Sequence, residues 1–334
     1  MIMQQIPANL HLWNRCHECG SQPIVGQRFE CQTCPAGPDR DLCSGCYARF
    51  LGGLVKHPKL RRGSTLFDNG KHHFREWQGV ADPEQLASWL SVPETTAREP
   101  QVPNAFLLRP ELQSGDDSFL GTYAFAIAHE RAPHGFLCTA LHVLDELARN
   151  SGVDCSVDNP NYTGRELPAI VSKVVVYDAF APDWILAEAG SARRMIVVPN
   201  ARTGDPEPFC QRDTALFALA PGGKLQLGKL TAGVPSLGQP LWLVASPGPK
   251  GHERRTIPAV VVASAPEVLV FRFTAREAPP RNTSGAPLID SSGQVVGINV
   301  GCGGFSDYYF GHAVHAASIH RLIASSVISA GDQN

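Results

Sequence analysis

The sequence predicts a mainly β protein, with a pair of β-barrels and a C-terminal helix behind a small metal-bound module. Two observations carry this prediction. Six of the ten cysteines lie before residue 47, and from about residue 118 the chain is a series of short apolar, β-branched runs broken by Gly, Pro, Asn and Asp. Since 334 residues exceed the length of one typical domain, we expect two folded units.

The composition argues against a disordered, a membrane or a nucleic-acid-binding protein. Hydrophobic residues make up 43% of the chain, charged residues 18%, and the formal net charge is -2, as in an ordinary globular protein. The first residues, "MIMQQIPANLHLWNRCHECG", contain no basic segment followed by an apolar one, and no later stretch has roughly 18 uninterrupted apolar residues. We therefore expect a cytoplasmic protein without a membrane partner.

The early cysteines form three C-x-x-C pairs, which are Cys16/Cys19, Cys31/Cys34 and Cys43/Cys46. Two thiolates at this spacing can reach one tetrahedral zinc ion, with each sulfur about 2.3 Å from the metal. Disulfides are the alternative, but they need an oxidising compartment. Six sulfurs leave two tetrahedral sites short of two ligands. His57, His72 and His73 follow the last pair, and we expect two of these three to bind zinc.

The segments "SQPIVGQRFECQTC" and "DLCSGC" resemble the ZZ-type zinc finger, and the resemblance covers residues 11–76. It implies two structural zinc ions in a cross-brace. The first ion would be held by Cys16, Cys19, Cys43 and Cys46. The second would be held by Cys31, Cys34, His57 and His72, with His73 as a substitute. Both sites are closed, so neither metal can activate a water molecule.

The resemblance also implies that the finger binds a peptide or a protein surface. Nucleic-acid binding is the competing interpretation, because residues 1–75 contain ten Lys and Arg against five Asp and Glu. A short basic run such as "KHPKLRR" is more typical of a solvated loop, so we expect no nucleic-acid partner.

Residues 77–117 are predicted to form a linker with one short helix. Asp82 can cap this helix, Pro83 suits its first position, and the helical segment "EQLASWL" follows. The next segment, "SVPETTAREPQVPN", is polar and rich in proline, which predicts a semi-rigid connection. We expect the finger and the larger domain, residues 118–326, to be separable.

Three segments of the larger domain supply a base, an acid and a nucleophile in chain order. They are "TALHVL" with His142, "RDTALFAL" with Asp213 and "NTSGAPLID" with Ser284. Each residue alone is equally typical of a strand end or a turn. Together they supply an imidazole that can take the serine proton and a carboxylate that orients the imidazole and stabilises its charged form.

These segments resemble the trypsin/chymotrypsin-like serine peptidases, in particular the HtrA-type branch, over residues 118–326. "FGHAVHAASIHRLI" is similar to the last strand and helix of that family. The resemblance implies a chymotrypsin-like double β-barrel in which His142 is the general base, Asp213 the orienting acid and Ser284 the acylated nucleophile. The backbone amides of Asn282 and Ser284 would form the oxyanion hole.

Two positions near the predicted site depart from motifs of known peptidases. Asn282 stands where the family has glycine, in a loop that often needs a positive φ, which asparagine tolerates. Asn299 stands where glutamate-specific relatives carry histidine, which disfavours glutamate selectivity by that device. His312 and Asp307 either line the substrate site or lie at strand ends.

The sequence as a whole predicts an intracellular serine endopeptidase that cleaves protein substrates and that its zinc finger recruits to a substrate or partner. The alternative is a catalytically inactive binding scaffold on the same fold, in which Asn282 marks a lost oxyanion hole.

Overall fold

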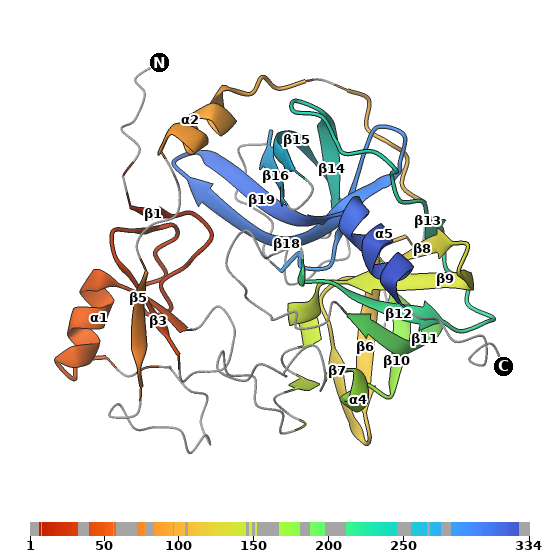
Figure 1. Cartoon of the computed structure of the whole chain (residues 1–334). Helices are drawn as coiled ribbons and strands as arrows, with labels where there is room; N and C mark the ends of the chain where they lie inside the picture. Colours follow the sequence, from red (N-terminus) through yellow and green to blue (C-terminus); the bar gives the residue numbers. More distant parts are fainter. Residues whose placement is uncertain are drawn as a thin grey trace.

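The chain is mainly β in the computed structural model, which contains an N-terminal finger, two barrels and a C-terminal helix (Figure 1). The predicted fold class is therefore confirmed. The structure describes residues 7, 9–32, 40–55, 57, 72–77, 83–95, 97–103, 106–144, 147–148, 151, 167–180, 188–197, 212–245, 255–265, 268–274 and 282–326. Among these residues, no helix combines the length and the apolar character needed to cross a membrane.

The finger is built around a three-stranded sheet and one helix. Its elements are β1 (Leu10–His11), β2 (Ile24–Val25), β3 (Arg28–Cys31), β4 (Asp41–Cys43), α1 (Ser44–Leu51) and β5 (Phe74–Trp77). Strand β3 lies between β4 and β5, and β1 pairs with β2. The interior holds few apolar side chains, among them Ile24, Leu42 and Phe50. Small domains with a core of this size usually need further stabilisation beyond apolar packing.

The first barrel is an eight-stranded sheet that nearly closes on itself. Its strands are β6 (Leu108–Ser114), β7 (Asp117–Leu120), β8 (Phe125–His129), β9 (Ala132–Thr139), β10 (Lys173–Asp178), β11 (Glu188–Val197), β12 (Ala215–Leu219) and β13 (Leu227–Gly228). They follow the order β13-β8-β9-β12-β11-β10-β6-β7. A bridge between Leu108 and Ala124 brings β6 back to the start of β8 and completes the ring. The short helix α4 (Leu167–Ile170) precedes β10.

The second barrel is closed, with the order β14-β15-β16-β19-β18-β17. Its strands are β14 (Pro240–Ala245), β15 (Arg255–Ala265), β16 (Val268–Phe273), β17 (Pro287–Ile289), β18 (Val295–Phe305) and β19 (Tyr308–His315). Helix α5 (Ala316–Ser325) follows at once, because His315 Nδ1 accepts the backbone N–H of Ala317 at 2.9 Å and caps the helix. The helix buries Ile319, Leu322 and Ile323. This stretch matches the predicted last strand and terminal helix.

Strands β6 and β7 begin inside the stretch that the sequence assigned to the linker. The sheet starts at Leu108, whereas the larger domain was expected to begin at residue 118. The sequence did not indicate strand β6 because Pro110 lacks the backbone N–H that a strand inside a sheet donates to its neighbour. Here the carbonyl of Pro110 accepts the N–H of Gly121 at 2.8 Å, at the end of the β6–β7 ladder, where a missing donor costs little.

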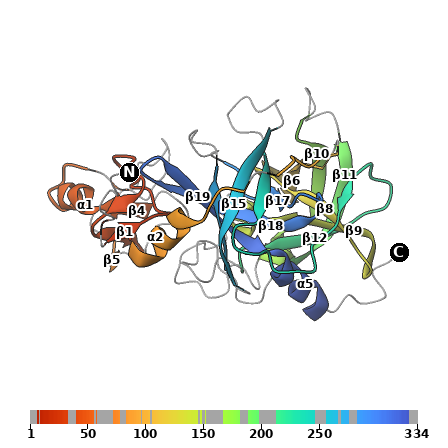
Figure 2. The same ribbon diagram turned by 90° about the horizontal axis from the view of Figure 1, so that it is seen from above.

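The remaining linker packs against the second barrel. Helix α2 (Pro83–Ser91) occupies the predicted helical segment, while Asp82, its expected cap, lies outside the described residues. The helix shares a hydrophobic core with the finger and the barrel, whose buried members are Leu10, Leu12, Leu86, Trp89, Val92, Val260, Val262, Val270 and Phe310. Both views place β1, α2 and the β18–β19 hairpin side by side (Figure 2). The finger and the barrel therefore have a hydrophobic core in common, and the separability of the two units stays a prediction.

Candidate active site and zinc centre

His142 and Asp213 come from two neighbouring strands of the first barrel. His142 lies in the 3-10 helix η3 (Leu141–Leu144) directly after β9, and Asp213 directly precedes β12. These strands pair with Thr139 opposite Ala215, which places both side chains at the same end of the ladder. His142 Nδ1 lies 2.6 Å from Asp213 Oδ2, and the backbone N–H of His142 donates to Asp213 Oδ1 at 2.9 Å. The carboxylate thus orients both the ring and the backbone of His142.

The His142 ring is accessible to solvent, whereas its carboxylate partner is mostly buried. The His142 side chain is 30% exposed and the Asp213 side chain 11%. When Nδ1–H donates to the carboxylate, Nε2 is the basic nitrogen of the ring. The pair can therefore accept a proton at Nε2 while the buried carboxylate stabilises the resulting charge.

The turn that carries Ser284 connects the second barrel to the first. Gly285 has φ +84°, and a Cβ atom there would lie 2.0 Å from the carbonyl oxygen of Tyr123, so only glycine allows this approach. The Thr139 hydroxyl donates to the same oxygen at 2.7 Å, and the Thr122 hydroxyl donates to the Ser284 carbonyl at 2.7 Å. Ser284 thus lies against the end of β9, directly before the helix with His142. The fold brings the three predicted triad residues to one junction between the barrels.

Asn282 adopts the left-handed backbone conformation, with φ +57°. Glycine adopts this conformation most easily, and asparagine is one of the few other residues that adopt it readily. In the part of the chain that the structure describes, the backbone N–H groups of Asn282 and Ser284 have no protein acceptor. Two amide donors of this turn therefore remain available for a bound oxygen atom.

The region behind the serine turn is polar and uncharged. The side-chain amide of Asn299, which is 1% exposed, donates to the carbonyl and hydroxyl oxygens of Thr283 at 3.1 and 3.0 Å. The Cys302 thiol donates to Asn299 Oδ1 at 3.8 Å. Burial raises the pKa of Cys302 to about 11, so this thiol is protonated at neutral pH. Asp307, one of the two candidates for the substrate site, lies exposed in the turn of the β18–β19 hairpin.

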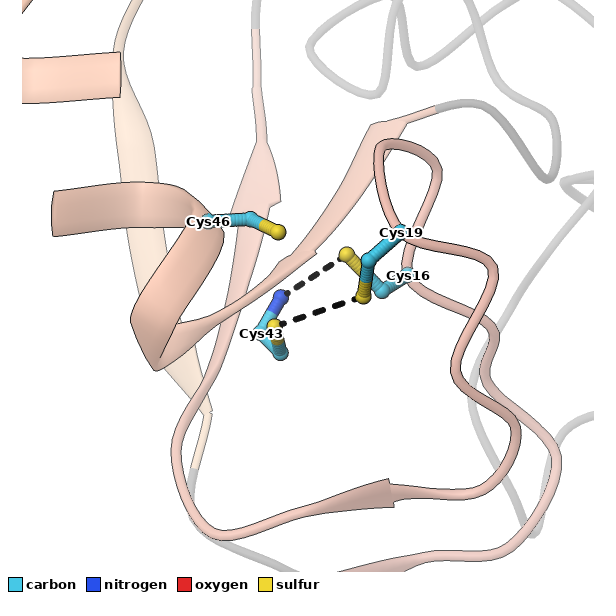
Figure 3. Close-up of side chains that lie close together, drawn as sticks. All are labelled: Cys16, Cys19, Cys43 and Cys46. Atoms are coloured by element: carbon cyan, nitrogen blue, oxygen red, sulfur yellow. Dashed lines mark hydrogen bonds between the residues drawn. The ribbon is translucent and has the colours of Figure 1, made fainter. Parts of the chain in front are cut away.

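Four of the predicted zinc ligands form one cluster. Cys16, Cys19, Cys43 and Cys46 have all their sulfur atoms within 4.8 Å of one another (Figure 3). Cys19 Sγ and Cys43 Sγ are 3.8 Å apart, and two sulfurs at about 2.3 Å from a tetrahedral zinc ion would be separated by about 3.8 Å. The first and third cysteine pairs therefore meet as the cross-brace requires, and the four thiols fit zinc.

A second group lies beside the aromatic core of the finger. Cys31, His57 and His72 have ligand atoms within 4.8 Å of one another, with Cys31 Sγ 3.3 Å from His72 Nδ1. His73 is exposed, so the structure places His72 rather than His73 in this group. Cys34, the fourth predicted ligand, lies outside the described residues. Three donors of the types that zinc prefers are therefore gathered here.

Several side chains that shape the site were not singled out from the sequence. Thr122 holds the serine turn, Gln22 bonds to the carbonyl of Cys302, and Trp13 stacks on His312. A lone threonine, glutamine or tryptophan carries no spacing signal. Each of these roles depends on a partner more than 100 residues away in the chain.

Comparisons with known proteins recognise the finger. Residues 12–53 match the family model described as "Zinc finger, ZZ type". No curated protein matches the chain. Among solved structures, the Rv3671c protease from M. tuberculosis in its active form is 17% identical to this chain, with a TM-score of 0.40. The match covers 70% of this chain and 93% of the chain of the protease.

The serine endoprotease from Yersinia pestis is 14% identical to this chain, with a TM-score of 0.38. That match covers 66% of this chain and 64% of the chain of the endoprotease. The fold of the larger domain follows from the strand order described above. The N-terminal module is a ZZ-type zinc finger.

Proposed function

We propose that the chain is an intracellular serine endopeptidase that cleaves protein substrates, with its finger held by two zinc ions and recruiting substrate or partner. The observation that carries the proposal is the His142–Asp213 pair, with Nδ1 and Oδ2 2.6 Å apart, beside the turn of Ser284. Thiolate zinc sites need reduced cysteines, which supports an intracellular location.

The proposed reaction uses each group in the role that its geometry suits. His142 Nε2 takes the hydroxyl proton of Ser284 as Oγ attacks the substrate carbonyl, and Asp213 stabilises the imidazolium that forms. The N–H groups of Asn282 and Ser284 receive the developing oxyanion, and one such donor is worth about 3 kcal/mol. His142 then returns the proton to the leaving amine, and water releases the acyl group through the same base.

The proposal is tested by covalent labelling with a fluorophosphonate. We expect the wild-type chain to be labelled at Ser284 and Ser284→Ala not to be labelled. His142→Ala should lower peptide cleavage by about 10³-fold or more, and the double variant should cleave little worse than either single one, because the residues act as a unit.

Ser291→Ala, an exposed serine in the turn before β18, is the matched control and should label like the wild type. A wild-type chain that never reacts at Ser284 would instead indicate an inactive binding scaffold.

A further inference from the structure

The finger lies directly against the β18–β19 hairpin. A Cβ atom on Gly303 would lie 2.3 Å from the carbonyl oxygen of Leu12, so the two backbones touch there. The Gln22 side-chain amide donates to the carbonyl of Cys302 at 3.2 Å. The finger therefore covers the part of β18 that contains Cys302 and Gly303.

This part of β18 continues from the serine turn. Gly285 N–H donates to Asn299 O, and Asn299 N–H donates to Ala286 O, both at 2.9 Å. Strand β17 pairs with β18 from Val295 to Ile298, and these two hydrogen bonds extend the pairing as far as Asn299. A peptide that reaches Ser284 and continues along this edge as an added strand would meet the finger next.

Trp13 and His312 form the surface at this place. Their rings stack with centroids 4.7 Å apart, and both residues are partly exposed. A Cβ atom on Gly301 would lie 2.1 Å from His312 Nε2, so the imidazole lies across the bare backbone of Gly301. Burial lowers the pKa of His312 to about 4, with smaller effects of Asp213 and His142, so the ring is neutral at pH 7. An uncharged aromatic stack thus lies against β18 at Gly301, two residues beyond Asn299.

Buried apolar side chains hold the finger beside this site. Leu10 and Leu12 are buried against Val260, Val262 and Phe310 of the barrel. Releasing the finger would expose these apolar side chains to water together, which opposes its release.

We propose that Trp13 of the zinc finger, stacked on His312, is a specificity-determining residue that receives an apolar side chain of the substrate next to the cleaved bond. The inference rests on the proposed function and adds a substrate preference to it. The stack offers apolar ring faces, and transferring a charged side chain onto them would cost its hydration.

A library of peptides tests this proposal in the full chain. We expect the wild type to favour Leu or Phe over Asp at one position close to the cleaved bond. The preference is the ratio of kcat/KM for the Leu or Phe peptide to kcat/KM for the Asp peptide. Trp13→Ala should lower this ratio about tenfold or more, while Trp13→Phe, which keeps a stacking ring, should retain most of it. Labelling of Ser284 by a small fluorophosphonate, measured on the same samples, separates a change of peptide preference from a loss of the reactive serine. Leu54→Ala, at a finger side chain that is 76% exposed, is the control and should leave the profile unchanged.

Binding to the Ser284→Ala chain separates this inference from the peptidase activity itself. The Leu-containing peptide should bind more tightly than its Asp counterpart, and adding Trp13→Ala should remove the difference. An unaltered cleavage or binding profile in Trp13→Ala would overturn the inference. So would a uniform rise in cleavage and labelling, because the finger would then be blocking the site. Loss of labelling in the wild type would contradict only the proposed function, and the binding measurement would still decide the role of Trp13.

Discussion

Asn282 shows how one residue supports the backbone of the serine turn. Its φ of +57° would cost most side chains about 1–2 kcal/mol, and asparagine is among those that bear it best. The sequence predicted that Asn282, which departs from the peptidase motif, decides between a working oxyanion hole and a lost one. It could not predict the Thr122, Tyr123 and Thr139 contacts, because they arise only when two barrels bring distant backbones together.

The residue-scale prediction follows from this φ value. Asn282→Gly should leave the rate of fluorophosphonate labelling within about threefold, because glycine adopts the same conformation without strain. Asn282→Val should slow labelling at least tenfold and lower the free energy of unfolding by about 1–2 kcal/mol, because a β-branched side chain resists a positive φ. Labelling kinetics and urea titration measure the two effects. A large loss of labelling in Asn282→Gly would mean that the asparagine side chain itself takes part.

Helix α2 depends on one buried side chain of β16. The Arg272 guanidinium donates to the carbonyls of Trp89, Leu90 and Val92 at 3.0, 2.8 and 2.7 Å. These groups lie at the C-terminal end of the helix, where carbonyls lack partners within the helix and a positive charge is favourable. The sequence predicted the helix from Pro83 and the segment after it. The arginine that docks it gave no signal, because its partners are about 180 residues away.

We therefore expect Arg272→Met to lower the free energy of unfolding by about 2–4 kcal/mol, because buried carbonyls lose their donors. Arg321→Met, which changes an exposed arginine of α5, should cost less than about 0.5 kcal/mol. Urea unfolding followed by tryptophan fluorescence compares the two variants. Equal stability of both would show that the helix is held by apolar contacts alone.

At the scale of the whole molecule, the finger and the second barrel are one folded body. The sequence predicted a finger and paired barrels, because cysteine spacing and strand periodicity are local signals. It did not predict their contact, since Leu10, Leu12 and Val260 look like ordinary strand residues until the fold places them in one core.

Removing zinc should therefore destabilise more than the finger. We expect about two zinc ions per chain by elemental analysis, and a strong chelator should lower the midpoint of thermal unfolding of the entire chain by several degrees. Added zinc should restore the midpoint, and Cys46→Ser should resemble the chelated wild type because it removes one ligand. An unfolding midpoint that chelation leaves unmoved would contradict the dependence of the shared core on metal.

The contact between Gln22 and Cys302 joins residues 280 positions apart. The ribosome therefore makes the two contacting segments at different times. During translation the finger leaves the ribosome well before the strands β18 and β19 that it contacts. At about 5–20 residues per second, the interval is on the order of 15–60 s. During that time the apolar residues Leu10 and Leu12 have no barrel to pack against, so the newly made finger is exposed to aggregation until the β18–β19 hairpin forms.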